Sequence, residues 1–286
     1  MSSVILGLVA ALSWGVYDFL SRFPSRAIGP IPTVLAVTFF GLVLLSAWVA
    51  VGGGGVTIVW PKLWLVAVAG IFFALATLAL FAAFALGPMT IVAPIVGSYP
   101  ALAMLFALTQ GARPTPAQWL AVACVMLGAV IISRSGGRYE RSGELAQGEM
   151  RRVIGLAALS GLCFAIAIAA GQAAVPVFGD VPTVWLARIF GLIAIGLIYS
   201  WRSPGAKLPV RWLPLLALMG CLDVAALAAL TAAGNLPSPE FTTVVSSAFG
   251  AITVMLARAF LKEPLAPAQL GGIVLIFGGV AALAAL

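Results

Sequence analysis

Residues 113–131, "RPTPAQWLAVACVMLGAVI", have a counterpart late in the chain at residues 262–280, "KEPLAPAQLGGIVLIFGGV". Both stretches contain Pro-Ala-Gln, at Pro116 to Gln118 and at Pro267 to Gln269, and both continue into an apolar run that contains glycine. An apolar helix of about 20 residues is long enough to cross the hydrocarbon core of a bilayer. This pair of stretches therefore suggests that the chain spans a membrane and that it contains a duplication.

The composition of the whole chain also indicates a membrane protein. Of its 286 residues, 63% are hydrophobic and 8% are charged, whereas a soluble domain has about 25% charged residues. The formal charge of +7 is a weak argument for nucleic-acid binding, because in membrane proteins the placement of Lys and Arg matters more than their sum. We therefore expect lipid, and no nucleic acid, around this chain.

Histidine is absent from the sequence, which removes the usual proton shuttle and the commonest metal ligand. The three cysteines, Cys124, Cys163 and Cys221, have no Cys or His neighbour at ligand spacing. We expect them to be small core residues, and we expect neither a metal site nor a cofactor. We therefore expect carboxylates to carry out any proton transfer.

Ten apolar runs are long enough to span a bilayer, and the first lacks the basic start and cleavage site of a signal peptide. One long polar segment, "RSGGRYERSGELAQGEMRR" at residues 134–152, separates five runs from five. We predict an all-α integral membrane protein with a first five-helix repeat at 1–134, a cytoplasmic linker at 135–151 and a second repeat at 152–286. The predicted spans are residues 4–22, 32–51, 63–86, 89–110, 117–134, 152–174, 182–201, 212–234, 239–261 and 268–286.

Two further matches support the duplication. "GLVAALSWG" from Gly7 resembles "GLAALSG" from Gly155, and Gly70 and Gly220 occupy matching places in the third and eighth spans. Because five is an odd number, the second repeat must enter the membrane from the opposite side, which makes the two halves inverted repeats. Inverted repeats are typical of secondary transporters that work by alternating access around a midplane site.

The distribution of basic residues predicts the orientation. Eleven Lys and Arg residues follow odd-numbered spans, and only Lys62 and Arg113 follow even-numbered ones. Cytoplasmic loops are enriched in Lys and Arg. The bias therefore places the linker in the cytoplasm and both termini outside.

Four charged residues lie more than two residues inside the ends of the predicted spans: Asp18, Arg188, Asp223 and Arg258. Arg258 is close enough to a helix end to reach the headgroups. Asp18 precedes Arg22 by four residues, which is the spacing at which two side chains on one helix can form an ion pair. Asp18 is therefore either structural, as a partner of Arg22, or part of a substrate-binding site; the sequence leaves both interpretations open. Such a pair would lie near the membrane interface.

Arg188 and Asp223 lie deeper in their spans. From the same side of the membrane, Arg188 is roughly 9 Å deep and Asp223 roughly 16 Å deep, at about 1.5 Å per residue, and a long Arg side chain can bridge that difference. We predict that Asp223 faces a cavity between the repeats and is either paired with Arg188 or protonated. Its role is then to bind a substrate ammonium group or a coupling proton, or else to form a purely structural pair.

Other candidates surround this pair in the predicted frame. Phe73 is the first-half equivalent of Asp223, and Trp14 and Tyr17 share a face with Asp18. The fourth and ninth spans contribute polar groups near mid-membrane, although Trp14 could be core and the serines could bond to their own helices. The predicted substrate-binding residues are Asp223, Arg188, Trp14, Tyr17, Asp18, Phe73, Pro94, Ser98, Tyr99, Ser246 and Ser247.

Three segments resemble the EamA-type branch of the drug/metabolite transporter superfamily. They are "LSWGVYDFL" (12–20), "FALGPMTIVAPIVGSYPALAMLFAL" (84–108) and "ARAFLKEPLAPAQLGGIVLIFGGV" (257–280). The resemblance implies a ten-helix carrier that exports or imports small metabolites such as amino acids or related amphiphiles. After the fourth span this chain has "GARP" where the family usually has Gly-Glu-Arg, whereas "KEP" after the ninth keeps an acid, Glu263, which we expect to cap structure.

We therefore predict a secondary active transporter and not an enzyme, in the inner membrane of a bacterium. A small-molecule substrate, membrane lipid and coupling protons are its expected partners, metabolite export is its expected direction, and the protein is a monomer or a dimer. A non-transporting scaffold and a passive channel are the alternatives. An intramembrane aspartyl protease is disfavoured, because its Pro-Ala-Leu motif should follow both acids, whereas Pro100 precedes Asp223.

Overall fold

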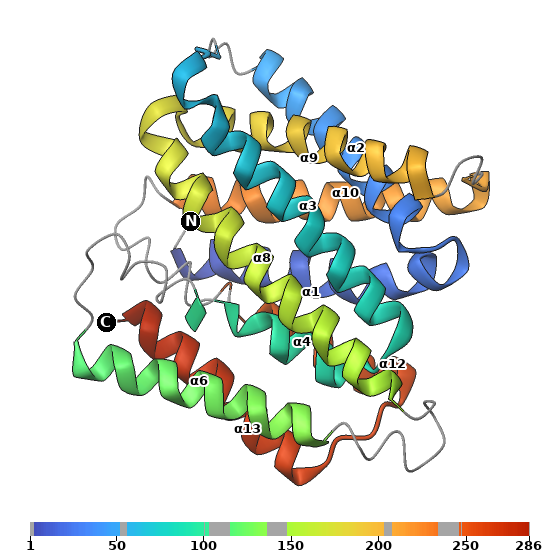
Figure 1. Ribbon diagram of the computed structural model, residues 1–286, viewed down its shortest axis with the longest axis vertical. Helices are drawn as coiled ribbons and strands as arrows, with labels where there is room; N and C mark the ends of the chain where they lie inside the picture. The colour runs from blue at the N-terminus through green and yellow to red at the C-terminus, as the bar shows by residue number, and fades with distance from the viewer. Residues whose placement is uncertain are drawn as a thin grey trace.

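The computed structural model describes residues 3–51, 56–99, 101–102, 115–135, 148–202, 208–233, 246 and 248–285. Within these ranges the regular structure is helical (Figure 1). Two short 3₁₀ turns, η1 (Trp60–Lys62) and η2 (Val210–Trp212), precede α3 and α10. The α-helices are α1 (Ser3–Ala27), α2 (Pro30–Val51), α3 (Leu63–Leu86), α4 (Met89–Gly97), α6 (Pro116–Ser135), α8 (Glu149–Phe178), α9 (Asp180–Arg202), α10 (Leu213–Ala233), α12 (Phe249–Leu261) and α13 (Pro267–Ala285).

Six of these helices are long and apolar enough to cross a membrane: α1, α2, α3, α8, α9 and α10. Shorter apolar helices cover Pro116–Ile132, Phe249–Leu261 and Pro267–Ala282. Large apolar side chains face outward, among them Leu197 and Trp201. The chain is therefore a multi-pass integral membrane protein, and the predicted fourth and ninth spans extend outside the described residues.

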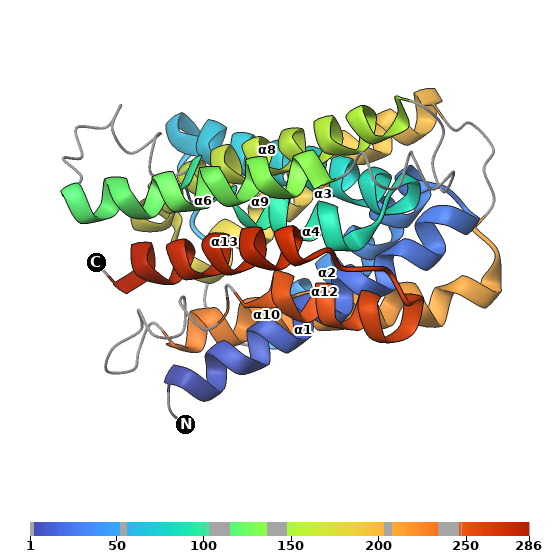
Figure 2. The same ribbon diagram turned by 90° about the horizontal axis from the view of Figure 1, so that it is seen from below.

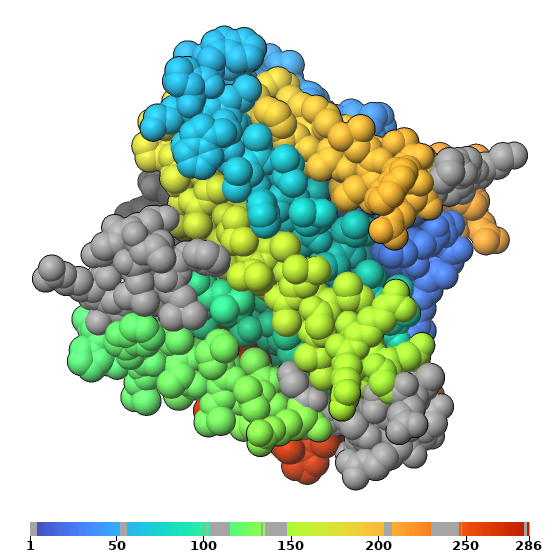
Figure 3. All heavy atoms as spheres, viewed as in Figure 1, coloured from blue at the N-terminus to red at the C-terminus, as the bar shows by residue number. Residues whose placement is uncertain are grey.

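The helices pack across the two halves of the chain. Helix α3 lies against α8 and α9, and α10 makes the matching contacts with α1 and α2. Helices α6 and α13 lie side by side in both ribbon views (Figures 1 and 2). Figure 3 shows α8 crossing the visible face between α3 and α6. The main buried cluster combines residues of both halves, such as Phe81, Phe84, Leu216 and Ile276, so the halves share one core.

The repeated Pro-Ala-Gln segments begin α6 and α13. Pro116 and Pro267 are the first residues of these helices, a position where the missing N–H of proline costs nothing. Gln118 accepts a hydrogen bond from the backbone N–H of Thr115 at 2.8 Å, and Gln269 accepts one from Ala266 at 2.7 Å. The sequence match is therefore an N-terminal capping motif that both halves use in the same way.

Gly70 and Gly220, which the sequence places at equivalent positions, make equivalent contacts. A Cβ atom on Gly70 would overlap the carbonyl of Ala187 on α9, and one on Gly220 would lie 2.9 Å from Cβ of Phe40 on α2. Each glycine thus lets the third helix of its half approach the second helix of the other half. Close helix contacts of this kind are typical of membrane proteins.

A buried polar cluster ties α1, α4 and the segment after α12 together. The Arg22 guanidinium pairs with the Glu263 carboxylate at 3.0 Å and donates to the carbonyl of Gly87 at 2.7 Å. Glu263 also accepts hydrogen bonds from the backbone N–H groups of Met89 (3.1 Å) and Thr90 (3.0 Å) at the start of α4. The expectation that Glu263 caps structure is confirmed.

Two expectations from the sequence are wrong. Arg22 pairs with Glu263 and not with Asp18, because α1 continues to Ala27 and brings Arg22 to the start of α4, where Glu263 accepts hydrogen bonds from two backbone N–H groups. Cys221 is exposed and not a core residue. It lies on the outer face of α10, two residues from the buried Asp223.

We expect Gly70→Ala to lower the unfolding temperature of the purified protein in detergent. The added methyl group must push α3 away from α9, and overpacking of this kind costs about 1–3 kcal/mol. Gly196→Ala on α9 is the matched control, because its Cβ would meet no neighbouring atom within 4 Å. An equal effect of both substitutions would contradict the close α3–α9 contact.

We expect Glu263→Ala to be more damaging, with a loss of about 3–5 kcal/mol in the free energy of unfolding, because it leaves a buried guanidinium without its carboxylate. Denaturant unfolding of the reconstituted protein measures this loss. Glu149→Ala removes an exposed carboxylate from the first turn of α8 and should have a small effect. If the two variants were equally stable, the Glu263 cluster would not hold α1 to α4.

Candidate functional site

An ion pair between α9 and α10 lies at the centre of the site. The Arg188 guanidinium donates through Nη2 to Oδ2 of Asp223. Only 7% of the surface of Arg188 and 3% of that of Asp223 is exposed. The second carboxylate oxygen, Oδ1, accepts a hydrogen bond from the indole Nε1–H of Trp14 on α1 at 3.1 Å. The predicted pairing of Asp223 with Arg188 is confirmed.

Neighbours from the first half of the chain shape the space around Arg188. The guanidinium carbon lies 5.8 Å from the ring centroid of Phe73 on α3, within the range of a cation–π contact. A Cβ atom on Gly41 of α2 would lie 2.6 Å from Nη1 of Arg188. Gly41 thus leaves the volume that the guanidinium occupies.

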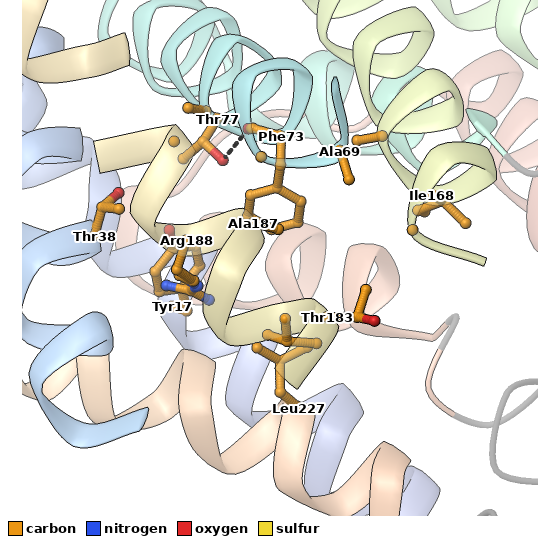
Figure 4. Close-up of a pocket in the computed structure, with 16 residues that line it drawn as sticks. Tyr17, Thr38, Ala69, Phe73, Thr77, Ile168, Thr183, Ala187, Arg188 and Leu227 are labelled. Atoms are coloured by element: carbon orange, nitrogen blue, oxygen red, sulfur yellow. Dashed lines mark hydrogen bonds between the residues drawn. The ribbon is translucent and has the colours of Figure 1, made fainter. Parts of the chain in front are cut away.

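Two cavities adjoin this ion pair. The first, of about 130 Å³, lies among α2, α3, α8 and α9, and Arg188 is part of its wall. Figure 4 shows Phe73 reaching from α3 toward Ala187 and Arg188, with Tyr17 close to the guanidinium. Thr183 also lines this cavity, and its buried hydroxyl has no hydrogen-bond partner among the described residues.

The second cavity, of about 90 Å³, lies among α1, α3, α4, α8, α10 and α12. Both carboxylates, Asp18 and Asp223, line it. Its remaining lining is mostly aromatic, with Thr77 and three aliphatic residues, Leu80, Val96 and Ile168. Four residues are common to the walls of both cavities, so only side chains separate them: Tyr17, Phe73, Thr77 and Ile168.

Asp18 differs from Asp223 in its surroundings. It is 5% exposed, yet no hydrogen bond or ion pair reaches its carboxylate from the residues that the structure describes. The Ser21 hydroxyl donates to the backbone carbonyl of Asp18 and leaves its side chain free. The site therefore contains one neutralised carboxylate, Asp223, and one, Asp18, without a partner among the described residues.

The structure gathers most of the predicted site residues. Trp14, Tyr17, Asp18, Phe73, Tyr99, Arg188 and Asp223 line one or both cavities. Pro94 is buried inside α4, and the Ser98 hydroxyl donates to the carbonyl of Ile95 at 2.6 Å. Neither these two nor the buried Ser246 is among the residues that line the cavities. Ser247 lies outside the described residues.

Sequence reasoning missed several residues of the site. Phe164 on α8 makes an edge-to-face contact with Phe73 at 5.3 Å, and Phe249 makes one with Trp14 at 6.1 Å. Thr77 also lines both cavities. In so apolar a sequence, nothing distinguishes these side chains from the many similar ones. Only the packing of the helices shows that they line the cavities. For the same reason, nothing in the sequence indicated that Gly41 contacts Arg188.

The arrangement favours binding over bond-breaking chemistry. An aspartyl protease needs two carboxylates that share a proton, whereas the Asp223 carboxylate is held by Arg188 and Trp14. Within the described ranges no three His, Cys, Asp or Glu residues come together as a set of metal ligands. What the site offers is an apolar cavity with a few fixed polar groups, as small-molecule sites generally do.

Comparison with known proteins agrees with this description. A model of the EamA-like transporter family matches residues 1–134 and 151–285. A solved structure, described as "Crystal structure of protein", aligns with a TM-score of 0.66 and 20% sequence identity, over 99% of this chain and 96% of that one. At this identity the likeness shows the fold alone. No curated protein matches the chain.

We expect Arg188→Gln and Asp223→Asn each to destabilise the protein by about 3–5 kcal/mol, because each leaves a buried charge without its partner. The double variant should recover a large part of this loss, since it removes both charges together. Unfolding of the three variants in lipid micelles measures the coupling free energy. Additive losses would mean that the two side chains do not depend on each other.

Proposed function

The chain belongs to the EamA-like transporter family of the drug/metabolite transporter superfamily, and on this basis we propose that it is a secondary active transporter. It moves a small amphiphilic metabolite, such as an amino acid or a related compound, by alternating access. The observation that carries the proposal is the buried Arg188–Asp223 pair between two cavities, at a place where helices of both halves meet. A charge that deep in a membrane protein typically marks a substrate or ion pathway.

The course of the helices supports two inverted repeats of five spans each. In Figures 1 and 2, α1 begins and α13 ends at the same end of the bundle, and α6 ends and α8 begins at the opposite end. Each helix of the first half runs against the direction of its counterpart in the second, as α3 and α10 do. This is the arrangement expected if each half crosses the membrane an odd number of times, with repeats at 1–134 and 152–286 joined by the linker at 135–151.

The cavities fit this mechanism in position and chemistry. They are enclosed by helices of both halves, so a small rotation of one half against the other would change which side they open to. An apolar cavity of about 150 Å³ is large enough for benzene. The two adjoining cavities, of about 130 Å³ and about 90 Å³, are together large enough for a small amphiphile. Thr183 in the wall of the first cavity and Asp18 in the wall of the second are among the polar residues available to it.

Protons are the proposed coupling ion, because carboxylates are the acidic groups of the site and the sequence contains no histidine. If a proton and the substrate compete for the same carboxylate, the carrier exchanges one for the other across the membrane, and no second binding site is needed. The basic residues place the linker in the cytoplasm. We propose export across the inner membrane of a bacterium as the physiological direction.

A screen for ligands followed by a transport assay tests the proposal. Amino acids, amines and organic acids that raise the unfolding temperature of the purified protein are then offered to proteoliposomes with an imposed proton gradient. We expect uphill accumulation that a protonophore abolishes. Flux that only equalises concentrations would indicate a channel, and no flux of any stabilising ligand would indicate a scaffold.

Filling the first cavity should block this transport. Gly171 lines the cavity, and a Cβ atom there meets no neighbouring atom within 4 Å, so Gly171→Leu can add bulk without disturbing helix contacts. We expect its transport rate to fall at least tenfold. Gly196→Leu, equally unobstructed but outside both cavities, is the matched control and should transport like the unchanged protein; equal rates in both variants would remove this cavity from the pathway.

A further inference from the structure

The charges around the second cavity do not balance. Asp18 and Asp223 contribute two carboxylates, and Arg188 contributes the one guanidinium that contacts them among the described residues. Arg188 and Trp14 satisfy both oxygens of Asp223. The next cation along α1, Arg22, is held by Glu263 and the carbonyl of Gly87. The cluster therefore has the charge of one uncompensated carboxylate, and that carboxylate belongs to Asp18.

A buried carboxylate without a partner is costly, and it is stable only when it takes up a proton or a cation. Among the described residues that line this cavity, none provides a cation to Asp18. The other titratable groups that line this cavity are Tyr17, Tyr99 and Asp223. The cavity residues from α3 and α12, Phe73, Thr77, Leu80 and Phe249, are uncharged. Asp18 thus lines the second cavity as a carboxylate whose negative charge no described residue neutralises.

Six aromatic residues line the same cavity as this carboxylate. They come from five different helices or their ends: Trp14, Tyr17, Phe73, Tyr99, Phe164 and Phe249. Contacts between the rings hold them in place, with Phe73 against Phe164 at 5.3 Å, Tyr99 against Phe164 at 6.2 Å and Trp14 against Phe249 at 6.1 Å. Rings arranged around a cavity attract an organic cation through their negative faces.

From these observations we infer that the second cavity binds an organic ammonium group, with Asp18 as its counter-ion and the aromatic rings as its cage. Asp223 is a positioning residue in this site. Its charge is already neutralised by Arg188, and its bond to Trp14 orients one ring of the cage. The inference rests on the proposed function and narrows its substrate class from amphiphiles in general to amines.

The same geometry assigns the exchange with protons to Asp18. When the ammonium group leaves, the Asp18 carboxylate takes up one proton, so that the cavity keeps its charge balance in each state. A proton and the amine therefore compete for one oxygen pair. Apparent affinity for an amine should fall as the pH is lowered, and each amine bound should displace one proton.

The test uses four small molecules that share a phenyl ring and differ in charge: phenethylamine (cation), phenylalanine (zwitterion), 3-phenylpropionate (anion) and 2-phenylethanol (neutral). Calorimetric titration of the full-length protein in lipid nanodiscs measures their binding. We expect phenethylamine to bind at least tenfold more tightly than the other three. Equal or tighter binding of the zwitterion or the anion would overturn the assignment of an ammonium site.

Substitutions then locate the counter-ion. Asp18→Asn should weaken phenethylamine binding at least tenfold and abolish its pH dependence, whereas Asp18→Glu, which keeps the charge, should retain the pH dependence. Asp180→Asn, at the exposed start of α9, is the matched control and should bind like the unchanged protein. Unchanged binding in Asp18→Asn, or loss of the amine in Asp18→Glu together with a normal unfolding temperature, would overturn the role of Asp18.

Proton displacement gives an independent readout. Titrations in two buffers with different ionisation enthalpies count the protons released when phenethylamine binds. We expect about one proton to be released at mildly acidic pH by the unchanged protein and none by Asp18→Asn. Equal release by both proteins would overturn the inference.

Transport measurements distinguish failure of the proposed transport function from failure of the proposed ammonium site. If phenethylamine binds through Asp18 but no vesicle assay shows movement across the membrane, the proposed transport function fails and the binding site stands. If amines are transported at the same rate by Asp18→Asn, the transport function stands and the inference fails.

Discussion

The Arg188–Asp223 ion pair lies where there is no bulk water to solvate it, and its surroundings come from both halves of the chain. A single charge at mid-membrane costs about 2.5–3.5 kcal/mol on insertion scales, so each partner requires the other. Trp14 from α1 satisfies the second oxygen of Asp223, Phe73 from α3 faces the guanidinium, and Gly41 from α2 leaves room for it. Helices of the first half are thus arranged around a charge pair that the second half supplies.

A symmetric frame encloses this asymmetric site. The capping motif that begins α6 and α13 is the same in both halves, and Gly70 and Gly220 provide matching close contacts. The position equivalent to Asp223, however, is Phe73, and both of these side chains contact the guanidinium of Arg188. Duplication accounts for the frame, and substitutions at single positions in one copy account for its polar interior.

Much of this fold could be predicted from the sequence, because spans are long apolar runs and capping motifs are local. The pairing of Asp223 with Arg188 was also predictable, since depth along a helix follows from residue count. The Arg22–Glu263 pair was not, because the two residues are 241 positions apart and a closer acid, Asp18, was available at helical spacing. For the same reason the sequence could not show that Asp18 lacks a partner. The aromatic residues Phe164 and Phe249 are recognisable only once the helices are placed.

The central claim is that the two halves enclose cavities that open alternately to the two sides of the membrane. Thr77 lines both cavities, so a single cysteine at this position, in a chain whose Cys124, Cys163 and Cys221 are replaced, reports their accessibility. The measurement is labelling in sealed, oriented vesicles by a membrane-impermeant thiol reagent added to one side at a time. The account predicts labelling from each side, with a balance that shifts when pH or a bound ligand changes. Labelling from one side only, under every condition of pH and ligand, would contradict it.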